Sequence, residues 1–129
     1  MEKLFSVARS ANLVNFPETK VLSIFYDDPD KVAAAELRSD ACITAPESTE
    51  APDEMHRVNI PGGRFAVAHV ELDPSEYGAA WKKLQADWIP SQGLQIDSES
   101  GRLCYEVYLN NPAEHPEQKH VVNICEPIV

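Results

Sequence analysis

The sequence feature that most constrains the fold is the segment of residues 102–112, in which apolar and aromatic residues alternate around a single carboxylate. Alternation with a period of two is typical of a β-strand, and the Asn-Asn-Pro that closes the segment is typical of a turn. Alternate residues of a strand share a face. One face carries Cys104, Glu106 and Tyr108, and the other carries Tyr105, Val107 and Leu109. The segment therefore predicts a central strand that places an acid beside a phenol.

Two interpretations of Glu106 follow from this pattern. A charged residue within a strand usually belongs to a solvated face, because glutamate is rarely buried without a partner. In the alternative, Glu106 lies in a partly apolar groove, where loss of hydration destabilises a carboxylate and an opposite charge stabilises it. Tyr108 would then supply an aromatic face that attracts cations. The second interpretation makes Glu106 and Tyr108 the leading candidates for ligand binding.

The length and composition set the class of protein. A chain of 129 residues with 43% hydrophobic and 25% charged residues is typical of one globular domain. The formal net charge of −10 argues against direct binding to nucleic acid, because the scattered basic residues form no patch that would meet phosphates. Without a long apolar segment or a signal peptide, we expect no membrane association and a cytoplasmic location.

The residues that commonly bind metals or form disulfides show no such pattern. The three cysteines, Cys42, Cys104 and Cys125, lack C-x-x-C spacing and are expected to be free thiols in a reducing compartment. The four histidines are dispersed without metal-ligand spacing. We therefore expect neither a metal site nor a cofactor.

Periodicity and turn residues predict the elements of the first half. Residues 2 to about 13 carry apolar side chains at helical spacing and are a predicted helix. Residues 21–26 and 37–45 are predicted strands, and Asp27-Asp28-Pro29 is a predicted turn. Residues 46–54 form an acidic, polar segment that we expect to be an exposed loop.

The second half is predicted to contain further strands around one well-marked helix. Residues 57–60 and 65–72 are a predicted strand pair, or one strand bent at Gly62-Gly63, and residues 120–125 are a final strand. Asp73 and Glu76 have the spacing of a capping box. The helix that follows is expected to end at Pro90. Its apolar stripe consists of Tyr77, Ala80, Trp81, Leu84 and Trp88.

The two halves share landmarks at a constant offset. The turns Asp27-Asp28-Pro29 and Asn110-Asn111-Pro112 are 83 positions apart. The same offset aligns Ser23 with Glu106 and Cys42 with Cys125. This predicts an α+β fold of duplicated β-α-β-β units with antiparallel sheets and pseudo-two-fold symmetry. Residues 1–54 would be a first repeat without its first strand, and residues 55–129 a second repeat. We expect a homodimer to cover the sheet edge left beside residues 37–45.

Four segments of the chain resemble the GyrI-like small-molecule-binding domain family, which includes the effector-binding domains of bacterial AraC-type regulators. They are Tyr-Asp-Asp-Pro at 26–29, Leu-Arg-Ser-Asp-Ala-Cys at 37–42, Ile-Pro-Gly-Gly-Arg-Phe-Ala-Val at 60–67 and Tyr-Glu-Val-Tyr-Leu-Asn at 105–110. The resemblance implies one domain over 1–129, with duplicated units and a groove for hydrophobic, often cationic molecules. It also implies that the groove contains a glutamate, in the strand that here carries Glu106. The chain departs from the family in lacking the first strand, and Glu71-Leu72-Asp73 stands where the family commonly has a glycine-containing turn.

The resemblance leads to one expected function and two alternatives. We expect a standalone effector-binding or multidrug-binding protein, because the chain carries no DNA-reading segment of a transcription regulator. One alternative is a hydrolase of reactive electrophilic toxins, with Glu106 as general acid or base. The other is an interaction module, such as a modulator of gyrase. The predicted ligand-binding residues are Glu106, Tyr108, Phe25, Tyr26, Trp81 and Trp88.

Overall fold

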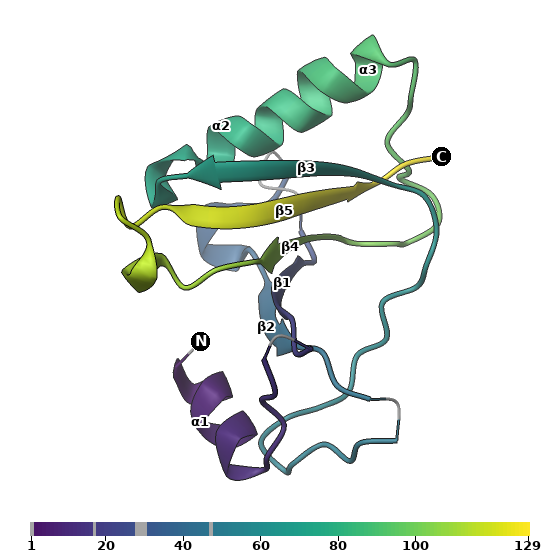
Figure 1. The fold of residues 1–129 in the computed structure, drawn as a ribbon. Helices are drawn as coiled ribbons and strands as arrows, with labels where there is room; N and C mark the ends of the chain where they lie inside the picture. Colours follow the sequence, from purple (N-terminus) through teal and green to yellow (C-terminus); the bar gives the residue numbers. More distant parts are fainter. Residues whose placement is uncertain (1, 17, 28–30, 47) are drawn as a thin grey trace.

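The computed structural model describes residues 2–16, 18–27, 31–46 and 48–129, with the side chains of residues 2 and 34 left out. Most of the predicted turn Asp27-Asp28-Pro29 lies outside the described residues. The chain has an α+β fold with one five-stranded antiparallel sheet, in the order β2-β1-β4-β5-β3 (Figure 1). In the described part of the chain, no helix has the length and apolar character needed to cross a membrane.

The regular elements follow the predicted order. The strands are β1 (Val21–Phe25), β2 (Ser39–Ile43), β3 (Phe65–Leu72), β4 (Cys104–Tyr108) and β5 (His120–Pro127). The helices are α1 (Glu2–Ser10), α2 (Tyr77–Lys82) and α3 (Ile89–Ser91), and a π-helical segment, Lys83–Trp88, joins α2 to α3. Short 3₁₀ turns occur at Ala34–Glu36, Pro74–Glu76 and Pro112–Glu114.

The predicted strand at residues 57–60 is wrong. Residues 55–64 form no regular element. The reason is topological: β2 and β3, which this segment connects, lie at opposite edges of the sheet. Four strand spacings of about 4.8 Å separate those edges. The segment therefore serves as an extended connection across the sheet and does not pair within it.

The predicted helix start is confirmed, but the predicted end at Pro90 is wrong. The backbone N–H of Asp73 donates to the Glu76 carboxylate at 2.8 Å, which is one half of a capping box. The helical path continues through Pro90 to Ser91. A proline inside a helix removes one backbone donor and crowds the preceding turn. Pro90 is nevertheless accommodated here, in the short α3 that follows the π-helical segment Lys83–Trp88.

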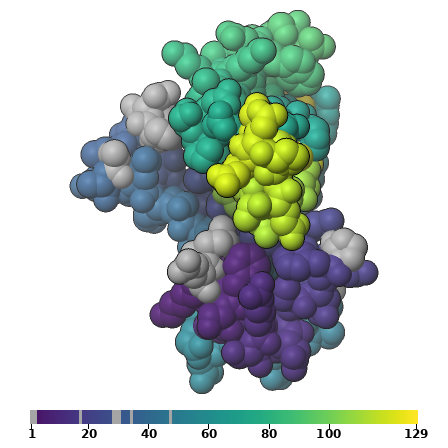
Figure 2. Space-filling model, turned by 60° about the vertical axis from the view of Figure 1, so that its left-hand side comes forward, coloured from purple at the N-terminus to yellow at the C-terminus, as the bar shows by residue number. Residues whose placement is uncertain are grey.

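The main core lies between the α2–α3 helical layer and one face of the sheet. Figure 1 shows α2 and α3 along the β3 and β5 side, with α1 near β2. Figure 2 shows the α2–α3 region in green and the N-terminal residues in purple at opposite ends of the molecule. The buried residues that form this core are Ala66, Leu84, Ile89, Val122, Ile124 and Ile128. On the opposite face of β1, Leu22 and Ile24 are also buried.

We predict that Ile124→Ala will lower the free energy of unfolding by about 2–5 kcal/mol, because the side chain is completely buried and its loss leaves a cavity. The matched control is Val67→Ala on β3, where the native side chain is 53% exposed. We expect the control to cost less than about 1 kcal/mol. Urea unfolding measures both values, and equal losses would contradict the assignment of the core.

Candidate functional site

Glu106 lies at the centre of the sheet. It belongs to β4, the middle strand, and is opposite Ser23 of β1 on one side and Ile124 of β5 on the other. Its side chain points to the face covered by α2, and only 5% of the residue is exposed. The interpretation of Glu106 as a solvated surface residue is therefore wrong.

Two neutral groups donate hydrogen bonds to the Glu106 carboxylate. Trp81 Nε1–H of α2 donates to Oε2 at 2.6 Å, and the Tyr108 hydroxyl donates to Oε1 at 2.8 Å. In the part of the chain that the structure describes, no ion pair includes Glu106. A buried carboxylate held only by neutral donors has lost hydration without gaining an opposite charge. Among its described partners, Glu106 therefore has two neutral hydrogen-bond donors and no cation.

The Tyr108 hydroxyl links Glu106 to the first half of the chain. Its oxygen lies 2.8 Å from both Glu106 Oε1 and Ser23 Oγ. Because a carboxylate only accepts, the phenol proton belongs to the bond with Glu106, and Ser23 satisfies the phenol oxygen. Burial raises the pKa of Tyr108, and the negative charge of Glu106 raises it further. Tyr108 therefore stays protonated and acts as a fixed donor.

Aromatic side chains surround this carboxylate on the helix-covered face. The rings of Phe25 and Trp81 meet edge to face, with centroids 6.1 Å apart. The Tyr77 hydroxyl lies 2.6 Å from His120 Nδ1. Burial and then the charge of Glu106 raise the pKa of Tyr77 to about 12. The structure thus adds Tyr77, which the sequence marked only as part of the helix stripe, to the surroundings of Glu106.

A second buried carboxylate, Glu126, lies on the same face and was not predicted as a site residue. Only 6% of it is exposed, and its Oε2 accepts from Gln85 Nε2 at 3.3 Å. Burial, followed by the charge of Glu126, raises the pKa of Cys104 to about 12. Such a thiol is a poor nucleophile. The missed signal was the alternation of Val122, Ile124 and Glu126, which continues β5 past the predicted end at residue 125.

The structure brings together four of the six predicted ligand-binding residues: Glu106, Tyr108, Phe25 and Trp81. Tyr26 lies elsewhere, with its hydroxyl donating to Asp40 Oδ2 at 2.5 Å. Trp88 is 45% exposed. In an α-helix, residues seven apart share a face, but the π-helical turn holds more residues and rotates Trp88 away. Ile89 takes its place in the core.

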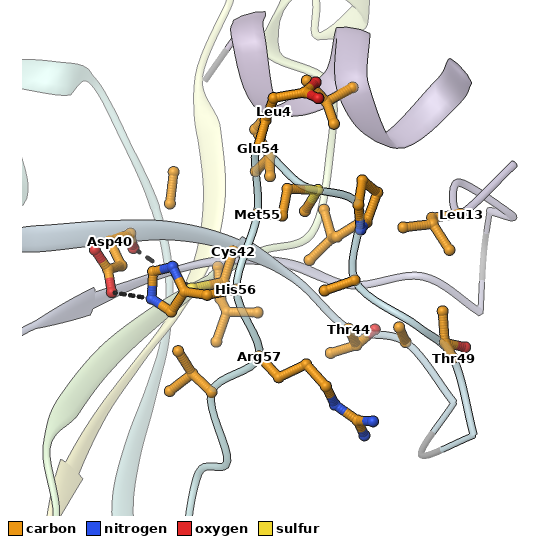
Figure 3. Close-up of a pocket in the computed structure, with 18 of the residues that line it drawn as sticks. Leu4, Leu13, Asp40, Cys42, Thr44, Thr49, Glu54, Met55, His56 and Arg57 are labelled. Atoms are coloured by element: carbon orange, nitrogen blue, oxygen red, sulfur yellow. Dashed lines mark hydrogen bonds and ion pairs between the residues drawn. The ribbon is translucent and has the colours of Figure 1, made fainter. Parts of the chain in front are cut away.

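In the part of the chain that the structure describes, the two best-formed cavities are lined by residues other than Glu106, Tyr108 and Trp81. The larger one, of about 680 Å³, lies against α1, β1 and β2 (Figure 3). Its strand residues Leu22 and Ile24 alternate with Ser23, so they face away from the Glu106 side of the sheet. The Glu106 site is therefore closed by α2, and the open cavity is a separate feature.

The site combines one buried carboxylate with aromatic surroundings on a sheet. Apolar sites with a few placed polar groups are typical of proteins that bind small molecules. The model of the GyrI-like small molecule binding domain matches residues 1–129. The chain belongs to this family, and the family resemblance drawn from its sequence motifs is confirmed.

Two relatives that the chain resembles in sequence are DNA gyrase inhibitors. A DNA gyrase inhibitor of Escherichia fergusonii is 31% identical over 102 residues, covering 77% of this chain and 64% of that protein. A DNA gyrase inhibitor of Pectobacterium carotovorum is 37% identical over 93 residues, covering 70% of this chain and 58% of that protein. The matched region thus spans less than two thirds of the length of these relatives.

We predict that Trp81→Phe will lower the free energy of unfolding by about 1–3 kcal/mol, because the ring is kept while a buried carboxylate oxygen loses its donor. Trp88→Phe on the same helical path is the matched control, since Trp88 is 45% exposed. We expect that change to stay within about 0.5 kcal/mol. Denaturant unfolding monitored by circular dichroism compares the two, and a larger loss for Trp88→Phe would refute the hydrogen-bond assignment.

Proposed function

We propose that the protein binds small hydrophobic cations on the α2 face of the sheet, with the positive charge at Glu106. The single observation that carries this proposal is the buried carboxylate whose described partners are neutral donors. Such a group has the most to gain from a cation, because the ion pair forms where water no longer screens it.

The surroundings of Glu106 match the rest of such a ligand. Phe25, Trp81 and Tyr108 present aromatic surface next to the carboxylate. Each aromatic face attracts a desolvated cation by roughly 0.5–2 kcal/mol. A ligand with delocalised charge and aromatic groups therefore gains from both its charge and its apolar body.

Binding requires α2 to move, because Trp81 occupies the position over the carboxylate. In our proposal the cation displaces the Trp81 indole from Oε2, while Tyr108 keeps its bond to Oε1. The π-helical segment and Pro90 directly follow α2. Such segments interrupt the regular hydrogen bonding of an α-helix. This supports the proposal that α2 can move away from the carboxylate.

The duplicated architecture is part of the same proposal. Ser23 and Glu106, which are 83 positions apart, are opposite each other where β1 meets β4. The register between β1 and β2 recurs at the same offset between β4 and β5. The corresponding pairs are Leu22 with Cys42 and Tyr105 with Cys125. These registers relate the strand pairs of two proposed units, residues 1–54 and 55–129, by a local two-fold axis between Ser23 and Glu106, with the acid in the second unit alone. The helices do not follow this axis, because α1 and α2 lie on opposite faces of the sheet.

The test uses tetraphenylphosphonium as the cation and triphenylphosphine oxide as a neutral analogue, titrated by calorimetry. Glu106→Gln keeps the size of the side chain and removes its charge. We predict that it weakens binding of the cation by about 1.5–3 kcal/mol, because the attraction between the two charges is lost at a site that water screens poorly, and leaves binding of the neutral analogue nearly unchanged.

The matched control is Asp87→Asn, which removes one charge from an exposed position on the α2–α3 helical path. It should leave the affinity for both ligands unchanged, because an exposed charge is screened by solvent. Equal losses for both ligands in Glu106→Gln, or no loss for either, would exclude Glu106 as the charge-reading residue. The hydrolase alternative is tested separately with a reactive electrophile as the probe, whose turnover mass spectrometry measures in the wild type and in Glu106→Gln.

A second candidate function is modulation of DNA gyrase. It is supported by the names of the relatives, which are DNA gyrase inhibitors. Addition of the purified protein to a gyrase supercoiling assay tests it, with Glu106→Gln as a parallel sample. Inhibition that a lipophilic cation alters in the wild type alone would connect the two functions, and full supercoiling at a large excess of protein would exclude this candidate.

We also propose that β2 pairs with a second copy of the chain to form a homodimer. β2 is an end strand of the sheet, and an open strand edge favours pairing with another strand. We predict concentration-dependent mass in light scattering, together with stronger hydrogen-exchange protection of β2 amides at high concentration. β3 is the other end strand of the sheet, so protection that rises at β3 and not at β2 would assign the contact to the wrong edge for this proposal. A constant monomer mass would rule out this dimer.

A further inference from the structure

The cavity on the far side of β1 and β2 is separate from the Glu106 site. Its lining comes from α1 and Leu13, from the strands β1 and β2, and from residues 44–46, 49–52 and 54–60 of the connection to β3. Its volume of about 680 Å³ is within the range of small-molecule sites, roughly 300–1,000 Å³. The Glu106 site lies on the opposite face, so the two sites share no lining residue among those described.

The walls of this cavity are mostly apolar. α1 contributes two aliphatic side chains, the strand β1 contributes two buried ones, and the crossing connection adds larger residues. The main apolar lining residues are Leu4, Val7, Leu22, Ile24, Met55 and Ile60. Such walls favour a ligand with an aromatic or aliphatic body, because burying apolar surface on both partners is favourable.

A fixed carboxylate, Asp40 of β2, lies at one end of the cavity. Its Oδ2 accepts from the Tyr26 hydroxyl at 2.5 Å, and His56 Nε2 lies 3.9 Å from the same oxygen. Figure 3 shows Asp40 and His56 facing each other at this end, with Leu13 at the opposite end. The Asp40 side chain is 34% exposed, so it remains accessible to a ligand in the cavity. Tyr26 orients the carboxylate, which gives this predicted ligand-binding residue a role here and not at Glu106.

The other charged groups of the lining do not cancel this carboxylate. Lys3 and Arg57 are accompanied by Glu50 and Glu54, so the remaining charges are balanced. In Figure 3 the Arg57 guanidinium points away from Asp40. Charge complementarity at the Asp40 end therefore favours a positive hydrogen-bond donor.

We propose that this cavity binds a lipophilic primary amine, with its ammonium group at Asp40 and its apolar body along α1 and β1. An ammonium group supplies three donors to a carboxylate, which a neutral hydroxyl of the same shape cannot match. This proposal does not depend on the Glu106 site.

Cys42 allows the site to be observed directly, because its half-buried thiol lines the cavity. Alkylation by iodoacetamide, followed by peptide mass spectrometry, gives its rate in rising concentrations of naphthylethylamine and of naphthylethanol. We predict that the amine slows alkylation of Cys42 in a saturable manner. Free N-acetylcysteine added to the same reaction is the internal reference, and its alkylation rate should not change.

Variants then test the role of the charge. Asp40→Asn should weaken binding of the amine by about tenfold to a hundredfold and change binding of the alcohol by less than about twofold. Asp53→Asn, an exposed acid of the same connection that does not line the cavity, is the charge-matched control. Ala51→Trp places a large ring at an exposed lining position and should weaken both ligands.

Glu106→Gln separates this proposal from the proposed function, because it should leave the protection of Cys42 unchanged. Absence of protection by the amine at any concentration would overturn the proposal. Equal weakening of the amine and the alcohol by Asp40→Asn would overturn the assigned role of the carboxylate, as would loss of protection in Glu106→Gln alone.

Discussion

The rest of the structure depends on how the carboxylate of Glu106 is kept in the centre of the sheet. A buried carboxylate costs several kcal/mol unless polar partners replace its water. Trp81 and Tyr108 replace that water from two directions, one from the covering helix and one from the same strand. The position of α2 on the sheet is thus coupled to the charge of Glu106. A ligand that supplies a better partner would change that position, which connects the packing of the fold to binding.

The two faces of the sheet provide different environments. On one face, a capped and proline-containing helical path covers two buried acids, Glu106 and Glu126. On the other, α1 and the long connection from β2 to β3 leave a cavity with Asp40 at one end. A single antiparallel sheet supports both environments, because alternate residues along its strands point to opposite faces.

The sequence predicted the parts of the fold that depend on local patterns. The alternation around Glu106 and the Asp73–Glu76 spacing each correspond to an observed element. Three features required information that local patterns lack. The burial of Glu106 arises from the packing of Trp81, which is distant in sequence. Trp88 is exposed because of a π-helical turn, whereas the prediction from periodicity assumed a regular α-helix. Residues 57–60 resemble a strand locally, but topology requires them to cross the sheet.

The most direct test of the account is a crystal structure of the protein with a lipophilic cation at saturating concentration. The decisive quantity is the distance from Trp81 Nε1 to Glu106 Oε2, which is 2.6 Å without ligand. Our account predicts that this hydrogen bond is broken, that the positive charge of the ligand takes the place of the indole, and that Tyr108 still donates to Oε1. A cation bound elsewhere, with the Trp81 hydrogen bond intact, would contradict it.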